Sequence, residues 1–494
     1  MADDKKELER QELHNKLWAI CNDLRGSING WDFKQYVLGM MFYRFISENI
    51  TDYINKIEQS ATGNKEFNFA DLEDSMIPDD MVKDLVKTKG FFIYPSQLFV
   101  NVCKKAPNDK NLNETMESIF KAITDSAVGT ESESNFSGLF DDINVNDKRL
   151  GNTVEKRNER IVKLLNGVSS MEFGNYKDNA IDAFGDAYEY LMGLYAAKAG
   201  KVGGEYFTPQ EVSELLCRLT TIGKTEVHKV YDPACGSGSL LLKFAKVLGV
   251  DKVRQGFFGQ EYEPTTYNLC RINMFLHDIP YNRFDIACED TMLHPQHRDE
   301  EPFDAIVCNP PLRINDDRFS PAGVLAPKNY EDFAFILHCL RALSSNGTAA
   351  IVCWPGIMYR SGAEQKIRKY LIDENKIDCI IQMPENMFFG VNISVCIMVL
   401  KHNKVDNNTL FIDADKEYKK VKKANKLTDQ NISNILNLYT RRENIQHVSS
   451  VGSNAVIGDK KHSYDLQVYT YVETEKELPI DINKVNAEIS ESVT

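Results

Sequence analysis

Two short motifs in this chain carry residue types that suit group transfer to a planar amine. Residues 309–312 read Asn-Pro-Pro-Leu and follow the apolar run 303–308, which predicts a buried strand that ends at an amide side chain. Residues 232–239 read Asp-Pro-Ala-Cys-Gly-Ser-Gly-Ser and follow another apolar run, so they predict a glycine-rich turn between a strand and a helix. Glycines in such a turn let the backbone approach a ligand closely. In this order, the two motifs indicate a nucleoside cofactor beside acceptors for an amino group.

The Asn-Pro-Pro motif predicts how a weakly nucleophilic nitrogen could be methylated. An exocyclic amine conjugated to a base has a delocalised lone pair. The side-chain oxygen of Asn309 and the backbone carbonyl of Pro310 could accept its two N–H groups and favour a pyramidal nitrogen. Pro310 and Pro311 lack an amide hydrogen and hold the backbone direction. Catalysis would then rest on positioning and electrostatics rather than on a strong base.

Carboxylates follow three successive predicted strands. In an open α/β sheet, ligands bind at the carboxyl ends of strands near the point where the strand order reverses. Asp232 ends the first strand and opens the glycine turn, Glu261 ends the second strand, and Asp290 follows the third. We expect Glu261 to accept the hydroxyls of a ribose and Asp290 to accept from the amino group of an adenine. Because Gly-Ser-Gly is shorter than a pyrophosphate-binding turn, S-adenosylmethionine fits better than a dinucleotide.

The elements that must position these residues alternate between strand and helix from about residue 200 onward, which predicts a mainly parallel seven-stranded α/β sheet. The predicted strands are 227–231, 256–260, 284–288, 305–308, 349–352, 379–382 and 394–400, and the helices are 240–248, 265–277, 332–343 and 364–373. A short polar turn, 404–408, separates the last strand from residues 409–413, and this spacing predicts an antiparallel hairpin at the sheet edge.

The pattern of apolar residues divides the chain into three domains. Residues 1–190 show helical periodicity and predict a helical N-terminal domain, 191–413 predict a Rossmann-like catalytic domain, and 414–494 predict a helical and irregular C-terminal tail. The tail begins with a run of lysines between residues 416 and 426. Such a run is more often a solvated face than a DNA-binding one.

Composition and charge narrow the class of protein. The chain is 43% hydrophobic and 26% charged, without an apolar run long enough to cross a bilayer or a signal-peptide segment. Its eleven cysteines form no C-x-x-C pair, which favours a reduced cytoplasm and no metal site. The net charge is −14. Because DNA affinity comes mainly from Lys and Arg, an acidic chain that acted on DNA would need a partner to supply much of its affinity, or a local basic face that the average charge hides.

These motifs, together with Gly204-Glu205-Tyr206-Phe207-Thr208-Pro209, resemble the N6-adenine amino-methyltransferases. More narrowly, the chain resembles the modification subunit of type I restriction-modification systems over nearly its whole length. The resemblance includes Leu13-His14-Asn15-Lys16-Leu17-Trp18 and Phe42-Tyr43-Arg44-Phe45 in the helical domain. It also includes residues 185–191 and the tail segment Tyr464-Asp465-Leu466.

The resemblance implies a role for each motif. The segment before the first strand would close over the methionine part of S-adenosylmethionine, and an aromatic after the sixth strand would stack on a flipped adenine. The cofactor-binding residues would be Glu205, Tyr206, Phe207, Thr208, Pro209, Gln210, Asp232, Gly236, Ser237, Gly238, Ser239, Glu261 and Asp290; the catalytic residues Asn309, Pro310 and Pro311; and the base-stacking candidates Leu312, Phe388 and Phe389.

As a family member, the chain would be a site-specific, adenine-specific DNA methyltransferase acting on double-stranded DNA. A specificity subunit would read the DNA sequence and carry two modification subunits, and a restriction nuclease subunit could join them. The acidic charge of the chain agrees with that organisation.

One position departs from the family pattern. The family has Tyr or Phe after Asn-Pro-Pro, and this chain has Leu312. Loss of a stacking face costs about 1–3 kcal/mol of base binding. The departure keeps open a non-catalytic or impaired subunit that binds S-adenosylmethionine as a scaffold. A third alternative is a methyltransferase for another planar amine or amide, in RNA or protein, because Asn-Pro-Pro would serve any of these acceptors.

Overall fold

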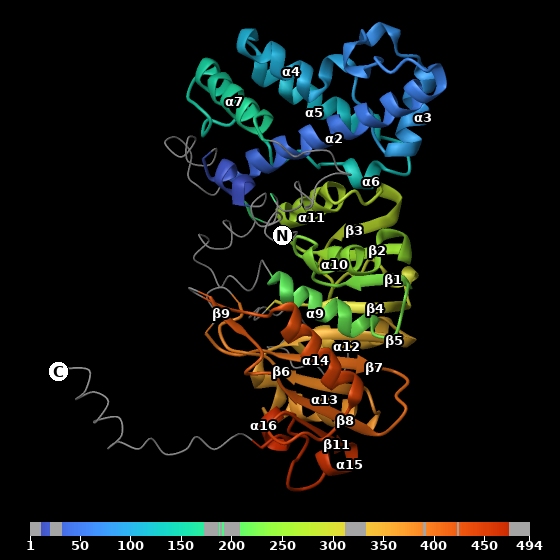
Figure 1. Ribbon diagram of the computed structural model, residues 1–494, viewed down its shortest axis with the longest axis vertical. Coiled ribbons are helices and arrows are strands. Elements are labelled where there is room, and N and C mark those ends of the chain that lie inside the picture. The colour runs from blue at the N-terminus through green and yellow to red at the C-terminus, as the bar shows by residue number, and fades with distance from the viewer. Residues whose placement is uncertain are drawn as a thin grey trace, which may run out of the picture.

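The computed structural model describes residues 11–19, 32–171, 187, 190–191, 208–311, 332–388, 392–421 and 424–473. It contains a helical part and a sheet part, stacked along the long axis of the molecule (Figure 1). The helical part lies against the sheet edge formed by β3 (Phe284–Cys288). Among the described helices, none is both long and apolar enough to cross a membrane.

The helical part is built around one long central helix, α2 (Asp32–Thr62). Nearly every residue of α2 between 36 and 46 is buried, so its neighbours cover it on all sides, as expected for a helix that is apolar all round. The surrounding helices are α3 (Asp79–Lys89), α4 (Phe99–Lys105), α5 (Leu112–Ser126), α6 (Glu133–Phe136) and α7 (Val154–Ser169).

The sheet part contains nine strands in the order β11-β8-β6-β7-β5-β4-β1-β2-β3. Strands β1, β2, β3, β4, β5, β6 and β8 run in one direction, and β7 and β11 run antiparallel to their neighbours. The other strand bounds are β1 (Val227–Asp232), β2 (Val253–Glu261), β4 (Phe303–Cys308), β5 (Leu343–Cys353), β6 (Ile377–Gln382), β7 (Cys396–Lys401), β8 (Asn408–Asp413) and β11 (Ser449–Ser453). A separate pair is formed by β9 (Lys419–Val421) and β10 (Ala424–Lys426).

The mainly parallel sheet expected from the sequence is confirmed, with two corrections. The sheet has nine strands rather than seven, and the polar turn 404–408 does not join neighbouring strands. Strand β7 lies between β5 and β6, whereas β8 pairs parallel with β6 and antiparallel with β11. Lys404, in this turn, bonds the first residues of both β6 and β8. Its Nζ donates to the carbonyls of Ile377 and Asn408, at 2.6 and 2.7 Å. The tail after residue 414 therefore contains a strand of the main sheet.

Helices cover both faces of the sheet, as in other parallel sheets. Alternate strand residues enter two different apolar clusters: Val307 and Val352 belong to the cluster that continues into the helical part, and Ile306 and Ile351 belong to the other. Helices α9 (Gln210–Thr221), α10 (Ser239–Leu248), α11 (Pro264–Leu276) and α14 (Asp429–Arg441) contribute to the first cluster, and α12 (Asp332–Ala342), α13 (Ala363–Asp373), α15 (Asn454–Ile457) and α16 (Val468–Tyr471) to the second.

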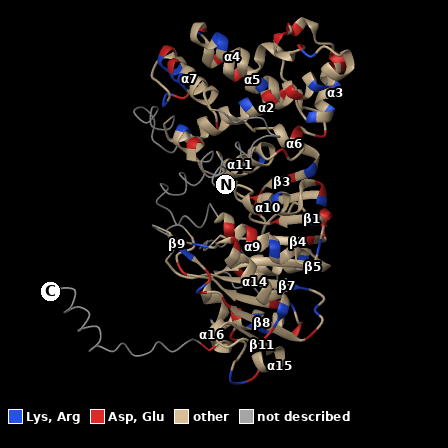
Figure 2. Cartoon of the chain, in the orientation of Figure 1, with Lys and Arg blue, Asp and Glu red and all other residues tan. Residues whose placement is uncertain are grey.

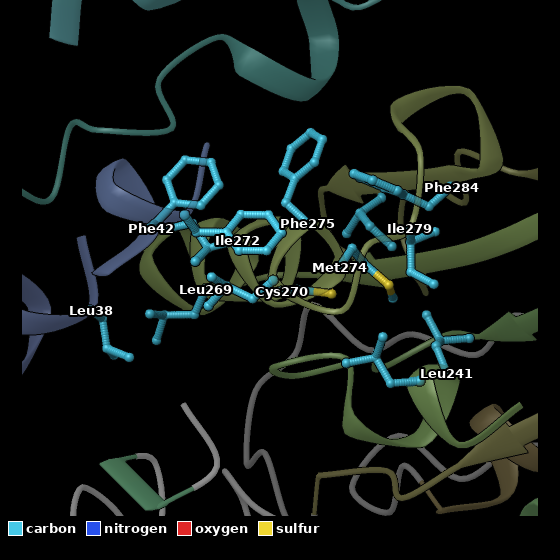
Figure 3. Close-up of a cluster of buried hydrophobic side chains, with 14 of the residues drawn as sticks. Leu38, Phe42, Leu241, Leu269, Cys270, Ile272, Met274, Phe275, Ile279 and Phe284 are labelled. Carbon is cyan, nitrogen blue, oxygen red and sulfur yellow. The ribbon is translucent and has the colours of Figure 1, made fainter. Parts of the chain in front are cut away.

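Helix α11 joins the sheet to the helical part. Figure 3 shows Phe42 of α2 beside Phe275 of α11, and their ring centroids are 5.8 Å apart. Phe275 also packs edge-on against Phe284 of β3, at 5.1 Å. On the same helix, Arg271 is only 1% exposed, and its guanidinium donates to the carbonyls of Ser134 and Ser137 at 2.8 and 2.9 Å. The junction thus combines apolar packing with a buried cation that bonds backbone carbonyls of the helical part.

Replacing Arg271 should loosen this junction. We expect Arg271→Met to lower the free energy of unfolding by roughly 3 kcal/mol, because buried carbonyls of the helical part would lose their donor. Urea denaturation of the purified protein would measure the loss. Arg218→Met is the control: its ion pair with Glu214 is exposed, so the change should stay within about 1 kcal/mol. Equal losses in the two variants would contradict the role given to Arg271.

Candidate active site

The glycine-rich turn follows β1 and leads into α10. Gly236 and Gly238 have φ angles of 53° and 81°, a region that favours glycine. A Cβ atom on Gly238 would lie 2.8 Å from Cys270 Sγ of α11, whereas one on Gly236 would meet no atom of the described residues within 4 Å. The turn is therefore packed against α11 at Gly238 and open at Gly236. The side of the turn at Gly236 has room for a ligand to approach the backbone.

Glu261, the last residue of β2, points its carboxylate at this turn. Its Oε2 accepts from the Gly236 N–H, and its Oε1 accepts from the Glu263 N–H, both at 3.0 Å. Burial raises the pKa of Glu261, and these N–H groups oppose the increase. Each oxygen keeps a further lone pair. A carboxylate held in this way can accept the two hydroxyls of a ribose beside the open side of Gly236.

Asp290 is oriented by the backbone after β3. It is 5% exposed, and its Oδ1 accepts from the N–H groups of Met292 and Leu293 at 2.9 and 3.1 Å. The next residue, Thr291, donates its hydroxyl to the carbonyl of Pro233 in the turn after β1, at 2.6 Å. This bond holds the β1 and β3 loops together, so Asp290 lies beside the same turn that Glu261 contacts.

Asp232, the last residue of β1, is fully buried, and its carboxyl group is only half satisfied. Oδ1 accepts from the Ala234 N–H at 3.0 Å, and Oδ2 has no hydrogen-bond partner among the described residues. Burial raises the pKa of Asp232 to about 8, and the Glu261 carboxylate adds to the increase. Both side-chain polar atoms of Gln210, the first residue of α9, also lack a partner within the described chain. Buried polar atoms without a partner, donors and acceptors alike, are expected where a polar ligand completes a site.

Asn309 follows β4, which is the direct neighbour of β1 in the sheet. Its Nδ2 donates to the hydroxyl of Thr208 at 3.0 Å, and Thr208 is 6% exposed. Pro310 is buried behind it. The structure thus brings the end of the segment before α9 into contact with the Asn-Pro-Pro motif, although 101 residues separate the two in the chain. Sequence reasoning placed Thr208 in the cofactor segment and missed this contact.

The remaining site predictions fall into two groups. Glu205, Tyr206, Phe207, Leu312 and Phe389 lie outside the residues that the structure describes. Phe388 is 5% exposed and belongs to the apolar cluster that continues into the helical part. Phe388 packs as a core aromatic does, and the base-stacking role of Leu312, Phe388 and Phe389 stays a prediction. Ser237 and Ser239 lie in the turn as expected, and the carbonyl of Ser237 accepts from Asn273 Nδ2 of α11 at 2.8 Å.

Fold and site together define a Rossmann-like α/β enzyme. The carboxyl edge of its sheet can bind a nucleoside after β1, and the neighbouring strand β4 ends at an amide acceptor, Asn309. The point where the strand order reverses lies between β1 and β4. Asp232 is the last residue of β1 and Asn309 directly follows β4, so both lie at the carboxyl ends of these neighbouring strands. This is where ligands bind in doubly wound sheets.

Comparison with known proteins agrees with this class. A family model described as N-6 DNA methylase matches residues 179–479, and one described as the HsdM N-terminal domain matches residues 13–168. The type I restriction enzyme MpnII methylase subunit of Mycoplasma pneumoniae is 44% identical over 99% of this chain and 94% of its own length. The MjaIX methylase subunit of Methanocaldococcus jannaschii is 26% identical over 87% of this chain and 77% of its own.

A solved structure extends the similarity to three dimensions. The type I restriction-modification system methyltransferase subunit from Streptococcus thermophilus superposes with a TM-score of 0.82 at 31% identity, covering 94% of this chain and 100% of that one. The chain therefore belongs to the N-6 DNA methylase family, and its similarity to type I methylase subunits covers both its helical part and its sheet. The family expected from the sequence is confirmed.

The raised pKa of Asp232 gives the stability of the protein a defined pH dependence. Between the ordinary value of 3.8 and the folded value of about 8, the unfolded chain ionises this group while the folded chain keeps it protonated. The folded state then binds more protons, so the free energy of unfolding falls as pH rises through this window. Asp232→Asn should remove that loss, so that the variant gains stability relative to the wild type between pH 5 and pH 8 in urea denaturation.

Asp378 is the matched control for Asp232. Burial would raise the pKa of Asp378, but ion pairs with Lys401 and Arg442, at 3.2 and 3.1 Å, outweigh burial and lower it. Asp378→Asn should therefore lose stability at pH 8, the opposite of Asp232→Asn. A difference between Asp232→Asn and the wild type that stayed the same at pH 5 and pH 8 would contradict the raised pKa.

Proposed function

We propose that this chain transfers the methyl group of S-adenosylmethionine to the N6 amine of adenine in double-stranded DNA, as the modification subunit of a type I restriction-modification complex. The observation that carries the proposal is the contact between Asn309 and Thr208, next to the strand end that holds Asp232 and the glycine turn. It brings an amide acceptor to the edge that carries the nucleoside-binding carboxylates. Family membership supports the same activity.

S-adenosylmethionine is the cofactor, and the residues at the three strand ends fit it. Glu261 has acceptors for the ribose, Asp290 can accept from the adenine amino group, and the open side of Gly236 leaves room for the nucleoside. The unpartnered Oδ2 of Asp232 leaves a buried polar atom available to the ligand, and a cationic ligand beside it would favour its ionised form. The cofactor supplies an electrophilic methyl group on a sulfonium. We assign to its site Glu205, Tyr206, Phe207, Thr208, Pro209, Gln210, Asp232, Gly236, Ser237, Gly238, Ser239, Glu261 and Asp290.

The contact with Thr208 orients the Asn309 amide for its proposed role. An amine that is to be methylated must direct its N–H groups at acceptors, so the oxygen of Asn309 has to face the substrate and its NH₂ group has to face elsewhere. Donation from Nδ2 to Thr208 Oγ1 provides this orientation. With the carbonyl of Pro310 as second acceptor, Asn309 and Pro310 would bind the amine more tightly as it becomes pyramidal. Tighter binding of the pyramidal amine than of the planar one lowers the activation barrier to methyl transfer.

The substrate base must leave the duplex to reach this edge, because its amine is otherwise paired inside the helix. Phe389 is our candidate for stacking on the flipped base. We assign residues 1–190 to a helical domain, 191–413 to the catalytic domain and 414–494 to a partner-binding tail whose strand β11 completes the catalytic sheet. A specificity subunit that carries two such chains would read the DNA sequence, and a nuclease subunit could join the complex.

Separate variants should distinguish cofactor binding from methyl transfer. We expect saturating S-adenosylmethionine to raise the melting temperature of the wild type by roughly 5 °C, since ligand at 100 times its Kd stabilises by about 2.7 kcal/mol. Glu261→Ala should abolish this shift because the ribose acceptors are lost. Asn309→Ala should keep most of the shift but lower methyl transfer to DNA by about 100-fold or more, measured with labelled cofactor and the specificity subunit present.

Glu226→Ala is the control for these variants, because Glu226 forms an exposed ion pair with Arg254 at 2.5 Å, at the amino end of β1. It should change neither the thermal shift nor the transfer rate. If Asn309→Ala lost the shift while Glu261→Ala kept it, the division of roles between the two strand ends would be wrong. Absence of transfer by the wild-type complex, despite a thermal shift, would favour a scaffold subunit.

The hydroxyl of Thr208 gives a further prediction about the rate. Thr208→Val removes the acceptor for Asn309 Nδ2 and should lower the turnover number about 10-fold, the equivalent of one hydrogen bond of about 1.4 kcal/mol. Thr208→Ser keeps the hydroxyl and should retain most of the activity. Steady-state kinetics at saturating DNA would measure both variants, and the Kd for S-adenosylmethionine should change little.

Thr221→Val is the control for Thr208→Val, because it also removes a buried hydroxyl in the same region. The Thr221 hydroxyl donates to the Cys217 carbonyl at the far end of α9, at 2.9 Å, away from Asn309. This variant should leave turnover unchanged. Equal turnover in Thr208→Val and Thr208→Ser would show that the hydroxyl does not orient Asn309.

A further inference from the structure

The pair of strands β9 and β10 forms a short basic projection, which we call the lysine hairpin. The segment from residue 416 to 426 contains six lysines and one glutamate in a chain whose net charge is −14. Lys419, Lys420 and Lys426 are exposed on the hairpin strands, and Lys422 and Lys423 lie outside the described residues. Elsewhere acidic and basic residues are interspersed over the body of the protein (Figure 2).

The sheet topology places the lysine hairpin at the edge that carries the candidate active site. Strand β8 runs parallel to β6, with Asp413 opposite Gln382, so both strands end at the same edge. Strands β4 and β1 also end there, since they run in the same direction as β6 across the sheet. The chain that leaves β8 at Asp413 therefore enters the hairpin at the edge where Asn309 follows β4.

Hydrogen bonds fix the hairpin to the loop after β6. The Asn425 N–H donates to the Asn386 carbonyl at 2.9 Å, and Asn425 Nδ2 donates to the Glu385 carbonyl at 2.8 Å. This loop leads directly to Phe388 and to Phe389, the stacking candidate. Asn425 is 9% exposed, so the hairpin is packed at this point rather than only tethered. The lysines are thus held close to where a flipped base would enter.

The three exposed lysines of the hairpin form no ion pair within the described part of the chain. Lys419 and Lys426 face each other across the pair, an arrangement in which like charges repel. No described carboxylate forms an ion pair with Lys419, Lys420 or Lys426. Glu417, the one acidic residue of the segment, instead accepts from Asn431 and Asn434 of α14, at 2.7 and 3.1 Å. Exposed cations that repel one another and form no ion pair among the described residues favour an anionic ligand.

Lys426 also links the hairpin to the segment that carries Thr208. Its positive charge acts on Glu211, in the first turn of α9: burial raises the pKa of Glu211, and Lys426 and Lys243 lower it. Glu211 lies three residues after Thr208, which contacts Asn309. The bonds to the β6 loop and the shared carboxyl edge of β8 and β4 place the hairpin beside the candidate active site, and the effect of Lys426 on Glu211 agrees with this position.

We propose that the lysine hairpin binds backbone phosphates of the DNA strand next to the base that enters the active site. The proposal rests on the proposed function and specifies which surface of this acidic chain holds the DNA. Exposed lysines on a rigid support suit the backbone phosphates of DNA of any sequence. An ammonium group acts as a point charge and makes no base-specific contact. Sequence recognition would remain with the specificity subunit.

The test removes the three described charges in the assembled complex. Lys419→Gln, Lys420→Gln and Lys426→Gln are combined in one chain, and labelled methyl transfer to unmethylated phage DNA is measured over a range of salt concentrations. We expect the KM for DNA to rise about 10-fold. The slope of log(kcat/KM) against log[salt] should become shallower by up to about 3, since each phosphate contact contributes about 0.9. The turnover number at saturating DNA and the thermal shift with S-adenosylmethionine should stay unchanged.

The control combines Lys460→Gln and Lys461→Gln, two exposed lysines in the loop after α15. It should leave both the KM and the salt slope as in the wild type. The proposal is overturned if the triple variant keeps the wild-type KM and slope. It is also overturned if the triple variant no longer elutes with the specificity subunit in size-exclusion chromatography, because the hairpin would then bind protein. Absence of transfer by the wild-type complex would instead refute the proposed function, and this proposal with it.

Discussion

The adjacency of β1 and β4 is the constraint on which the rest of the site depends. The chain builds β1, β2 and β3 toward one edge and then returns to place β4 on the other side of β1. That reversal separates the loops after β1 and β4 and leaves a space between them at the carboxyl edge. The turn at Gly236 and the amide of Asn309 come from these loops. The donor and the acceptor of the proposed methyl group can meet only because the two strands are neighbours.

Hydrogen bonds between loops convert this adjacency into a defined geometry. Glu261 bonds the turn after β1, Thr291 bonds the same turn from the β3 loop, and Thr208 bonds Asn309 from the start of α9. Each bond connects segments that are far apart in the chain. These bonds hold the described part of the site together, and Asp232, Glu261 and Asn309 lie at or directly after strand ends. This suits a reaction in which positioning and electrostatics supply most of the catalysis.

The sequence predicts those parts of the fold that local patterns encode. The strands that carry the site were predictable because each is an apolar run that ends in a turn, and the spacing of Asp232, Glu261 and Asp290 indicated their common edge. Strand β11 was not predictable, because its sequence, Ser-Ser-Val-Gly-Ser, shows only weak alternation of polar and apolar residues and offers little apolar surface. The insertion of β7 between β5 and β6 depends on pairing between distant strands, which a turn length does not encode. The contact of Thr208 with Asn309 spans 101 residues and follows from no motif.

The position of β11 has a consequence for how the protein is made. Strand β8 has β6 on one side and β11 on the other, and β11 comes from residues 449–453, long after the catalytic motifs. During synthesis, β8 leaves the ribosome before its outer neighbour exists. Until then, the backbone N–H and C=O groups on its outer side are open to pairing with other chains. A premature stop between residues 413 and 449 would therefore yield a chain with every proposed catalytic residue and a sheet edge prone to aggregation.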